Sequence, residues 1–436
     1  MTDSILKVND LIISFLQEKN WREVIHHISF ELYPNEILGI VGESGSGKSV
    51  SSLAVMGLLP KNVSNINTGN ITYLGKDITK LSDKNFQNIR GNELSMIFQE
   101  PMSSLNPSIT CGDKVAEILE THTSLTSKEI NNEVLRLFHQ VKLPDPETLY
   151  EKYPHQISGG QKQRVMIAMA IACKPKVLIA DEPTTALDVT VQKEIILLLK
   201  SLQQETGMSI IFISHDLALI SEICNRVLVM YKGEIVEQGN AQKIFHNPQH
   251  IYTQALIGSR PSLDVRLKRL PTIQDFLDGK EHSETITKEV RTENLKQLYN
   301  QKPLLRVVNV EKEYLLRANL FKPNTYFKAV NQVSLEVYEG ETLGLVGESG
   351  CGKSTLGNAI LQLDPATKGQ IFYRDQDITK LSKSDLKALR KEIQIIFQDP
   401  FASLNPKITV GEAILEPMKV HRLYTNDKER KQKVLD

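Results

Sequence analysis

Short, continuous apolar runs mark the predicted strands of this chain. The most distinct are Ile37–Val41, Val177–Ala180 and Ile210–Ile213. Runs of this length without alternation are typical of parallel strands that are buried on both faces. Leu343–Val346 has the same character and is expected to form a further strand. All of these runs are far shorter than the roughly 18 apolar residues that a membrane-spanning helix needs.

Helices are expected directly after two glycine-rich segments. After the first, apolar Leu53, Met56 and Leu59 recur at helical spacing and share one face. After Gly159 and Gly160, the sequence RVMIAMAIA predicts a long helix rich in alanine and methionine. Together with the buried strands, these helices indicate an α/β fold.

The pattern occurs twice. The sequence LGIVGESGSGKS at residues 38–49 recurs at 343–354 as LGLVGESGCGKS, and MIFQEP at 96–101 recurs at 395–400 as IIFQDP. Matches in the same order at both places indicate that one ancestral domain was duplicated. We therefore expect two tandem α/β domains.

The expected domains differ in length. We predict a first domain at 1–260, a charged and partly helical linker at 261–303, and a second domain at 304–436. The second copy stops at Asp436 inside a predicted helix, without the glycine or proline that commonly ends one. We expect the second domain to be truncated and the chain to be a fragment of a longer protein; a natural truncation is the alternative.

Composition narrows the function classes. The 52 basic and 52 acidic residues balance, which gives no general attraction to nucleic acid or anionic lipid. The N-terminus lacks the basic region and apolar stretch of a secretory signal. We expect a protein that reaches a membrane only through another protein. The four cysteines form no CxxC pair and are expected to be reduced, unliganded thiols; they are Cys111, Cys173, Cys224 and Cys351.

Two glycine-rich loops match the pattern of a phosphate-binding loop, or P-loop. The first consists of Gly42, Glu43, Ser44, Gly45, Ser46, Gly47, Lys48 and Ser49, followed by Val50. The second consists of Gly347, Glu348, Ser349, Gly350, Cys351, Gly352, Lys353 and Ser354, followed by Thr355. The glycines let backbone N–H groups point into one concavity, and the lysine reaches the β and γ phosphates. Two copies in matching context predict tandem P-loop NTPase domains that bind ATP, with Ser49 and Ser354 placed to ligate Mg²⁺.

The run at Val177–Ala180 ends in Asp181 and Glu182. This is the edge at which doubly wound sheets bind ligands. Asp181 is expected to hold Mg²⁺ through water, and Glu182 to polarise the attacking water, because phosphoryl transfer depends mainly on positioning and charge neutralisation. In isolation such a pair more often marks a turn, but after a P-loop it predicts hydrolysis of ATP.

The segment Ser158, Gly159, Gly160 and Gln161 places a second set of exposed amides at a helix N-terminus. Here the sequence resembles the ABC ATPase family, whose signature it matches with isoleucine where leucine is usual. In that family the signature binds the γ-phosphate of the ATP held by the opposing domain. The resemblance implies the remaining roles of single residues: metal and transporter sensing for Gln99 and Gln398, a loop between the two sites for Asp188, a γ-phosphate switch for His215, and adenine stacking for Trp21 in the first copy and Tyr326 or Phe327 in the second.

The stretch FQEPMSSLNP and the tail HNPQHIYTQAL at 246–256 resemble the ATPase subunits of bacterial dipeptide and oligopeptide importers. Two copies in one chain are similar to the fused double ATPases that serve peptide, glutathione or peptide-antibiotic uptake. The resemblance implies two integral-membrane permease subunits, an extracytoplasmic solute-binding protein, no nucleic acid, and peripheral attachment at the cytoplasmic face of the inner membrane. Some relatives carry a cysteine cluster after the tail; this chain has no cysteine between Cys224 and Cys351, so an iron–sulfur site is not expected.

The family resemblance also implies a head-to-tail pseudo-dimer with two ATP molecules between the domains. The second copy lacks a signature and a catalytic glutamate, so no composite site within this chain has all its parts. Poor turnover is expected unless the first copy pairs with itself. Two alternatives are a soluble twin-ABC protein that acts on ribosomes or DNA and a non-catalytic regulator. The neutral charge and the tail around Tyr252 weigh against the first of these.

Overall fold

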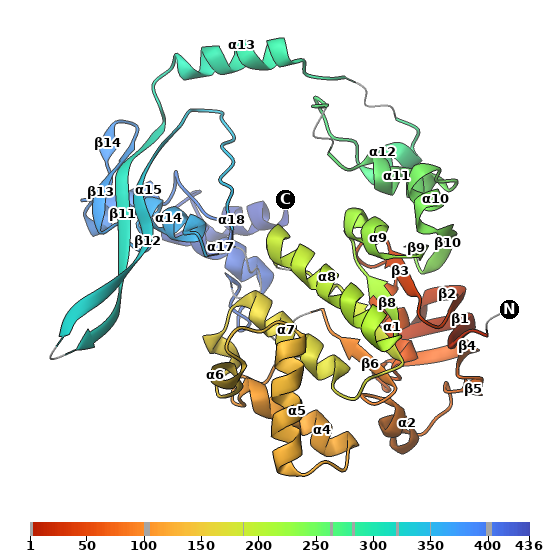
Figure 1. Ribbon diagram of the computed structural model, residues 1–436. Helices are drawn as coiled ribbons and strands as arrows, with labels where there is room; N and C mark the ends of the chain where they lie inside the picture. The colour runs from red at the N-terminus through yellow and green to blue at the C-terminus, as the bar shows by residue number, and fades with distance from the viewer. Residues whose placement is uncertain are drawn as a thin grey trace. The chain divides into compact units, whose positions relative to one another are not determined.

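The structure is a computed structural model that describes residues 3–99, 105–185, 187–261, 265–280, 284–319, 322–348, 350–397 and 403–436. Contacts divide the chain into two compact units, Met1–Ile286 and Thr287–Asp436. Figure 1 shows both units along the chain. The first unit includes more than half of the segment that was expected to be a linker.

The first unit is built on a six-stranded sheet of order β10-β9-β3-β8-β7-β6. Its strands are β3 (Ile37–Val41), β6 (Leu94–Ile97), β7 (Val177–Asp181), β8 (Ser209–Ile213), β9 (Arg226–Tyr231) and β10 (Glu234–Asn240). All neighbours pair in parallel except the edge strand β10. Every residue of β3, β7 and β8 is buried, which confirms the strands predicted from the apolar runs.

A second, antiparallel sheet of order β2-β1-β4-β5 belongs to the same unit. Its strands are β1 (Leu6–Gln17), β2 (Asn20–Leu32), β4 (Ser64–Tyr73) and β5 (Lys76–Asp77). The helix α1 (Lys48–Val55) packs with this sheet against one face of the central sheet. Leu38 and Ile40 of β3 point to that face, whereas Ile37 and Val41 point to the other. This alternation lets one short strand join two cores.

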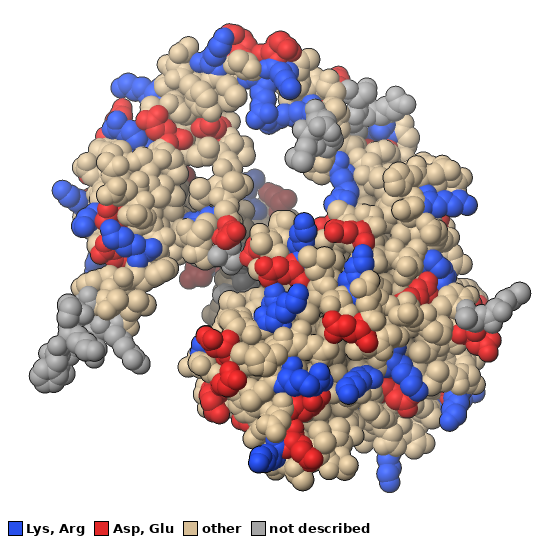
Figure 2. All heavy atoms as spheres, in the orientation of Figure 1, with Lys and Arg blue, Asp and Glu red and all other residues tan. Residues whose placement is uncertain are grey.

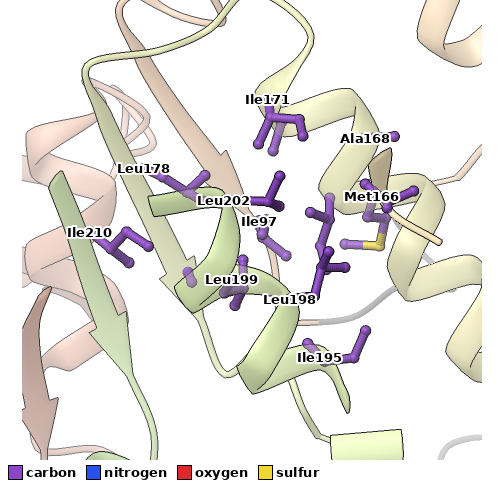
Figure 3. Packing of buried hydrophobic residues seen from close by; sticks show 14 of the residues in the cluster. Ile97, Met166, Ala168, Ile171, Leu178, Ile195, Leu198, Leu199, Leu202 and Ile210 are labelled. Carbon is purple, nitrogen blue, oxygen red and sulfur yellow. The ribbon is translucent and has the colours of Figure 1, made fainter. Parts of the chain in front are cut away.

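The other face of the central sheet is covered by helices. Figure 3 shows Leu178 of β7, Ile171 of α7 and Leu202 of α8 within this core. The helices of the unit after α1 are α2 (Asp83–Ile89), α4 (Cys111–His122), α5 (Ser127–Gln140), α6 (Pro146–Tyr150), α7 (Gly159–Ile171), α8 (Val189–Thr206), α9 (Leu217–Ile223), α10 (Ala241–His246), α11 (Ile251–Gly258) and α12 (Ile273–Leu277), with a 3₁₀ turn at Pro154–Gln156. The long helix expected after Gly160 is confirmed as α7.

The second unit repeats the antiparallel part of the first. Its sheet has the order β12-β11-β13-β14, and a helix, α14, follows the second glycine-rich loop as α1 follows the first. Its elements are α13 (Lys288–Tyr299), β11 (Leu305–Asn319), β12 (Lys322–Val337), α14 (Lys353–Ile360), β13 (Lys368–Tyr373), β14 (Gln376–Asp377), α15 (Lys383–Leu389), α17 (Val410–Val420) and α18 (Asp427–Leu435). Helices α12 and α13 confirm that the segment expected to be a linker is partly helical.

The prediction of a strand at Leu343–Val346 is wrong. The segment is irregular, and the side chain of Val346 is 91% exposed. Its counterpart β3 is held by hydrogen bonds to β8 on one side and β9 on the other. Among the described residues of the second unit, no strand pairs with this segment. Local apolar character therefore does not suffice to form this strand, because its stability comes from its neighbours.

The surface agrees with the balanced composition. Figure 2 shows acidic and basic side chains intermixed over the visible face. Among the described residues, no helix has the length and apolar character needed to cross a membrane. The four cysteines are free thiols, with Cys111 and Cys224 buried and Cys351 exposed.

Candidate nucleotide site

The first glycine-rich loop joins β3 to α1 and needs glycine at particular positions. Gly47 has a φ of 102°, and a Cβ atom there would lie 2.4 Å from Cδ1 of Ile25. A Cβ atom at Gly42 would lie 2.2 Å from the carbonyl oxygen of Met230. Any larger residue would therefore strain or displace the loop.

The loop leaves several backbone amides without a partner. Among the described residues, no carbonyl or side chain accepts from the N–H groups of Gly45, Gly47, Lys48 and Ser49. These amides lie at the N-terminus of α1, where the helix dipole adds positive potential. Such a cradle is suited to a phosphate group.

Lys48 is held inside the same loop. Its Nζ donates to the carbonyl oxygens of Gly42 and Glu43, each at 2.8 Å, and its side chain is buried. Burial lowers the pKa of Lys48, while the charges of Glu182 and Asp181 oppose that shift. The two carbonyl oxygens thus hold the ammonium group within the loop that carries the unpaired amides.

Asp181, the last residue of β7, offers an oxygen ligand. Its carboxyl group is buried, and burial raises its pKa, although a hydrogen bond from Ser49 opposes the shift. Its Oδ1 atom has no hydrogen-bond partner among the described residues. A buried, unpartnered carboxylate oxygen beside a serine hydroxyl fits a hard divalent cation such as Mg²⁺, which prefers oxygen ligands.

The carboxylate of Glu182 connects three loops. Its Oε2 accepts from Nε2 of Gln99 at 3.2 Å and from the hydroxyl of Thr185 at 2.9 Å, and lies 3.1 Å from Nδ1 of His215. All three contacts are made by Oε2, and Oε1 has no hydrogen-bond partner among the described residues. Glu182 also has a φ of 48°, a left-handed conformation that is costly for a residue with a side chain and is often kept at functional sites.

The segment at Ser158 forms the start of α7. The Ser158 hydroxyl accepts a hydrogen bond from the amide of Gln161, and the Gln161 side chain accepts one from the amide of Ser158 at 2.9 Å. This reciprocal capping box explains why the segment folds locally. Gly160 lies so close to α8 that a Cβ atom at this position would be 2.9 Å from Cγ1 of Val191. Asp188 caps α8 by accepting from the amide of Val191.

The glycines of the second glycine-rich loop have nearly the same φ values as those of the first. Gly350 and Gly352 have φ values of 80° and 98°, against 82° and 102° at Gly45 and Gly47. Lys353 donates to the carbonyl oxygens of Gly347 and Glu348, as Lys48 does to those of its own loop, but its side chain is less buried. Ser349 and Gln398 lie outside the described residues.

The predicted adenine-stacking residues lie on hairpins. Trp21 of β2 pairs with Leu16 near the end of the β1–β2 hairpin, and 53% of its side chain is exposed. Tyr326 and Phe327 lie in β12 and are about half exposed. No described contact joins any of the three to a P-loop, so their roles stay predictions.

Sequence reasoning missed two contacts of the site. The hydroxyl of Thr185 donates to the carboxylate of Glu182 within the same loop. A hydroxyl residue three positions after a carboxylate is the sequence signal that could have indicated this contact. The hydroxyl of Tyr252 accepts from the amide of Glu43 at 2.9 Å, although the two residues are 209 positions apart. Nothing in the local sequence indicates that second contact.

The central sheet, the P-loop and the carboxylates at the end of β7 define an α/β nucleotide-binding protein. The chain belongs to the ABC transporter family, whose profile matches residues 25–185 and 330–436, and it is an ATPase of that family. The profile of the oligopeptide/dipeptide transporter C-terminal region matches residues 236–283. These matches agree with the resemblance inferred from the motifs.

Individual proteins give the same result. The glutathione import ATP-binding protein GsiA of Escherichia coli strain K12 is 45% identical over 427 residues, which cover 96% of this chain and 68% of that protein. GsiA of Shigella dysenteriae serotype 1 matches equally well. A dimeric ATP-binding cassette in a post-hydrolysis state with ADP and Pi superimposes with a TM-score of 0.50 at 25% identity, covering 54% of this chain and 98% of that one.

Proposed function

We propose that this chain binds and hydrolyses Mg·ATP at its first P-loop and energises a bacterial ABC importer of peptides or related small solutes such as glutathione. The observation that carries the catalytic part is the position of Glu182. Gln99, Thr185 and His215 hold one of its carboxylate oxygens. The other oxygen is left to orient a water molecule as a general base.

The other site residues act on the phosphates. The free amides of the loop from Gly42 to Ser49 bind the phosphate oxygens, and Lys48 neutralises charge on the β and γ phosphates. Ser49 and Asp181 would hold Mg²⁺, which supplies further neutralisation of phosphate charge when bound. His215 and Gln99 position Glu182 and respond to the γ-phosphate. Each role follows from charge and donor type at one edge of the sheet.

The second P-loop binds a second nucleotide in the same way. We assign metal sensing in this copy to Gln398. The loop consists of Gly347, Glu348, Ser349, Gly350, Cys351, Gly352, Lys353, Ser354 and Thr355. The signature Ser158–Gln161 and Asp188 complete a site on an opposing domain. We propose two tandem ABC domains in this chain. In this arrangement Ser158 faces a P-loop of another domain, or of a second copy of the first one.

The importer assignment rests on the match of residues 236–283 to the peptide-transporter C-terminal region and on the identity to the glutathione import proteins. The proposed partners are two permease subunits in the inner membrane and an extracytoplasmic binding protein, with this chain attached to the cytoplasmic face. The permease and the binding protein set the solute. These matches favour a transporter over a soluble twin-ABC protein acting on ribosomes or DNA.

Uptake of labelled solute tests the proposal. The chain is expressed with its cognate permeases and binding protein in cells that lack their own glutathione and peptide importers. Uptake of glutathione or of a dipeptide should require the chain, and Glu182→Gln should abolish it at equal protein level. Glu234→Gln is the matched control, because this exposed carboxylate begins β10. Uptake that is equal with and without the chain would refute the importer role.

A further inference from the structure

The helix α11 reaches the nucleotide site from a segment far along the chain. Its residue Tyr252 is completely buried and stacks on Tyr231, with ring centroids 4.1 Å apart. Its hydroxyl accepts the hydrogen bond from the amide of Glu43 at 2.9 Å. Glu43 lies within the P-loop, and its carbonyl also accepts from Lys48. The tyrosine therefore contacts the peptide that leads into the phosphate cradle.

The position of Tyr252 is itself fixed. The carboxylate of Glu237 on β10 accepts from the amides of Gln249 and His250, which precede the helix, and the ring of His250 caps it by accepting from the amide of Tyr252. Because the anchors lie on the central sheet, the Tyr252 hydroxyl is held at a defined place relative to the loop. A hydrogen bond to an immobile partner restricts the loop more than a bond to a mobile side chain.

The same segment also reaches the loop that carries His215. Arg260, which follows α11, pairs with the carboxylate of Asp216 at 2.9 Å. Asp216 caps α9 and directly follows His215. Both partners are partly exposed, so this ion pair contributes little energy. It does show that the segment spans from the P-loop to the loop after β8.

From these contacts we propose that Tyr252 is a positioning residue of the first nucleotide site, whose hydroxyl holds the P-loop in the conformation that binds ATP. The proposal rests on the proposed function of that loop and assigns a role in it to the C-terminal segment. On this proposal the segment that contains α11 both packs on the central sheet and contributes to the nucleotide site.

Comparison with the second P-loop indicates how large the effect of Tyr252 on ATP binding can be. It has nearly the same glycine dihedrals, and none of the described residues of its unit accepts a hydrogen bond from the amide of Glu348. The loop conformation therefore does not require the tyrosine. Tyr252 acts on how firmly the loop is held, so its loss should weaken ATP binding without removing it.

The test uses the full chain with Lys353→Ala, so that calorimetric titration with Mg·ATP reports the first site. Tyr252→Phe removes the hydroxyl and keeps the ring. We expect it to weaken ATP binding about threefold to tenfold, the range that loss of one hydrogen bond produces. Tyr231→Phe is the matched control, because the contact of Tyr231 with Tyr252 is through the ring, and should stay within twofold.

Two further variants separate the possible outcomes. If Tyr252→Phe binds ATP as the parent does while Tyr252→Leu binds weakly, the residue only packs and the proposal is overturned. Lys48→Ala tests the P-loop itself: unchanged ATP affinity there would refute the proposed function, whatever Tyr252→Phe does.

Amide hydrogen exchange without nucleotide gives a readout that does not depend on ATP. Tyr252→Phe should speed exchange in the peptide that contains Glu43 and leave the peptide that contains Glu348 unchanged. Equal exchange at Glu43 in parent and variant would also overturn the proposal, because the hydroxyl would then restrain nothing.

Discussion

Oε2 of Glu182 lies 3.1 Å from Nδ1 of His215, although the two residues belong to loops after different strands. β7 and β8 are parallel neighbours, and Asp181 pairs with Ile213 at their carboxyl ends. The backbone amide of Glu182 donates to the carbonyl of Ile213 at 2.9 Å. The sheet register therefore places the carboxylate and the imidazole side by side.

Glu182→Gln should stop hydrolysis while preserving ATP binding. The amide has the same shape but cannot act as a base, and general-base catalysis is typically worth about 100-fold or more in rate. We expect steady-state phosphate release to fall by at least that factor, with the ATP dissociation constant within twofold. Turnover is measured at high protein concentration, which favours pairing of first domains. Undiminished phosphate release would remove Glu182 from the role of base.

Lys48→Ala should weaken nucleotide binding. The substitution removes a buried ammonium group that lies within the loop and would pair with phosphate. Charge-assisted contacts of this kind are strong, so we expect a loss of about tenfold or more in ATP affinity at the first site. Titration with Mg·ATP in the Lys353→Ala background measures it. Lys200→Ala, at an exposed position of α8, is the control and should bind as the parent does.

Asp181→Asn should stabilise the nucleotide-free protein and remove its response to Mg²⁺. Burial raises the pKa of Asp181, so ionisation disfavours the folded state. Because the folded pKa is raised, this penalty is absent below the ordinary pKa of aspartate, grows as the pH rises from that value to the folded pKa, and is constant above it. Asparagine avoids the penalty and keeps an oxygen for the Ser49 hydroxyl. We expect Asp181→Asn to be more stable than the parent at neutral pH, with a difference that disappears toward about pH 4.

Thermal unfolding over a range of pH tests this prediction. The parent should gain stability from Mg·ATP beyond that from ATP with a chelator, and Asp181→Asn should show no such difference. Asp188→Asn is a suitable comparison, because that carboxylate caps α8 and asparagine is also a good helix cap. A Mg²⁺ response that survives in Asp181→Asn would exclude this carboxylate as the metal ligand.

The sequence predicted those features whose cause is local. The buried strands, the glycine loops and the helix after Ser158 follow from apolar runs, from dihedral requirements and from a capping box within four residues. Contacts across the fold could not be predicted in this way. The bond between Glu43 and Tyr252 depends on how α11 sits on β10. The prediction failed at Leu343–Val346 because an apolar run forms a central strand only when neighbouring strands accept its hydrogen bonds.

Packing of α8 on the central sheet should account for much of the stability of the first unit. Leu199 is completely buried in the core drawn in Figure 3, whereas Leu197, two residues earlier on the same helix, has 51% of its side chain exposed. Leu199→Ala should lower the free energy of unfolding by about 2–5 kcal/mol, because it removes buried methyl groups and leaves a cavity. Leu197→Ala changes the same atoms at an exposed position and should cost less than about 1 kcal/mol.

Denaturant unfolding followed by the fluorescence of Trp21 can compare the two leucine variants. Trp21 is the only tryptophan of the chain and lies in the first unit, so its signal reports that unit. Because the substitution is the same in both variants, effects of alanine on helix propensity cancel in the difference. Equal midpoints for Leu199→Ala and Leu197→Ala would mean that α8 does not pack on the sheet as described, and the placement of Asp188 at its start would fall with it.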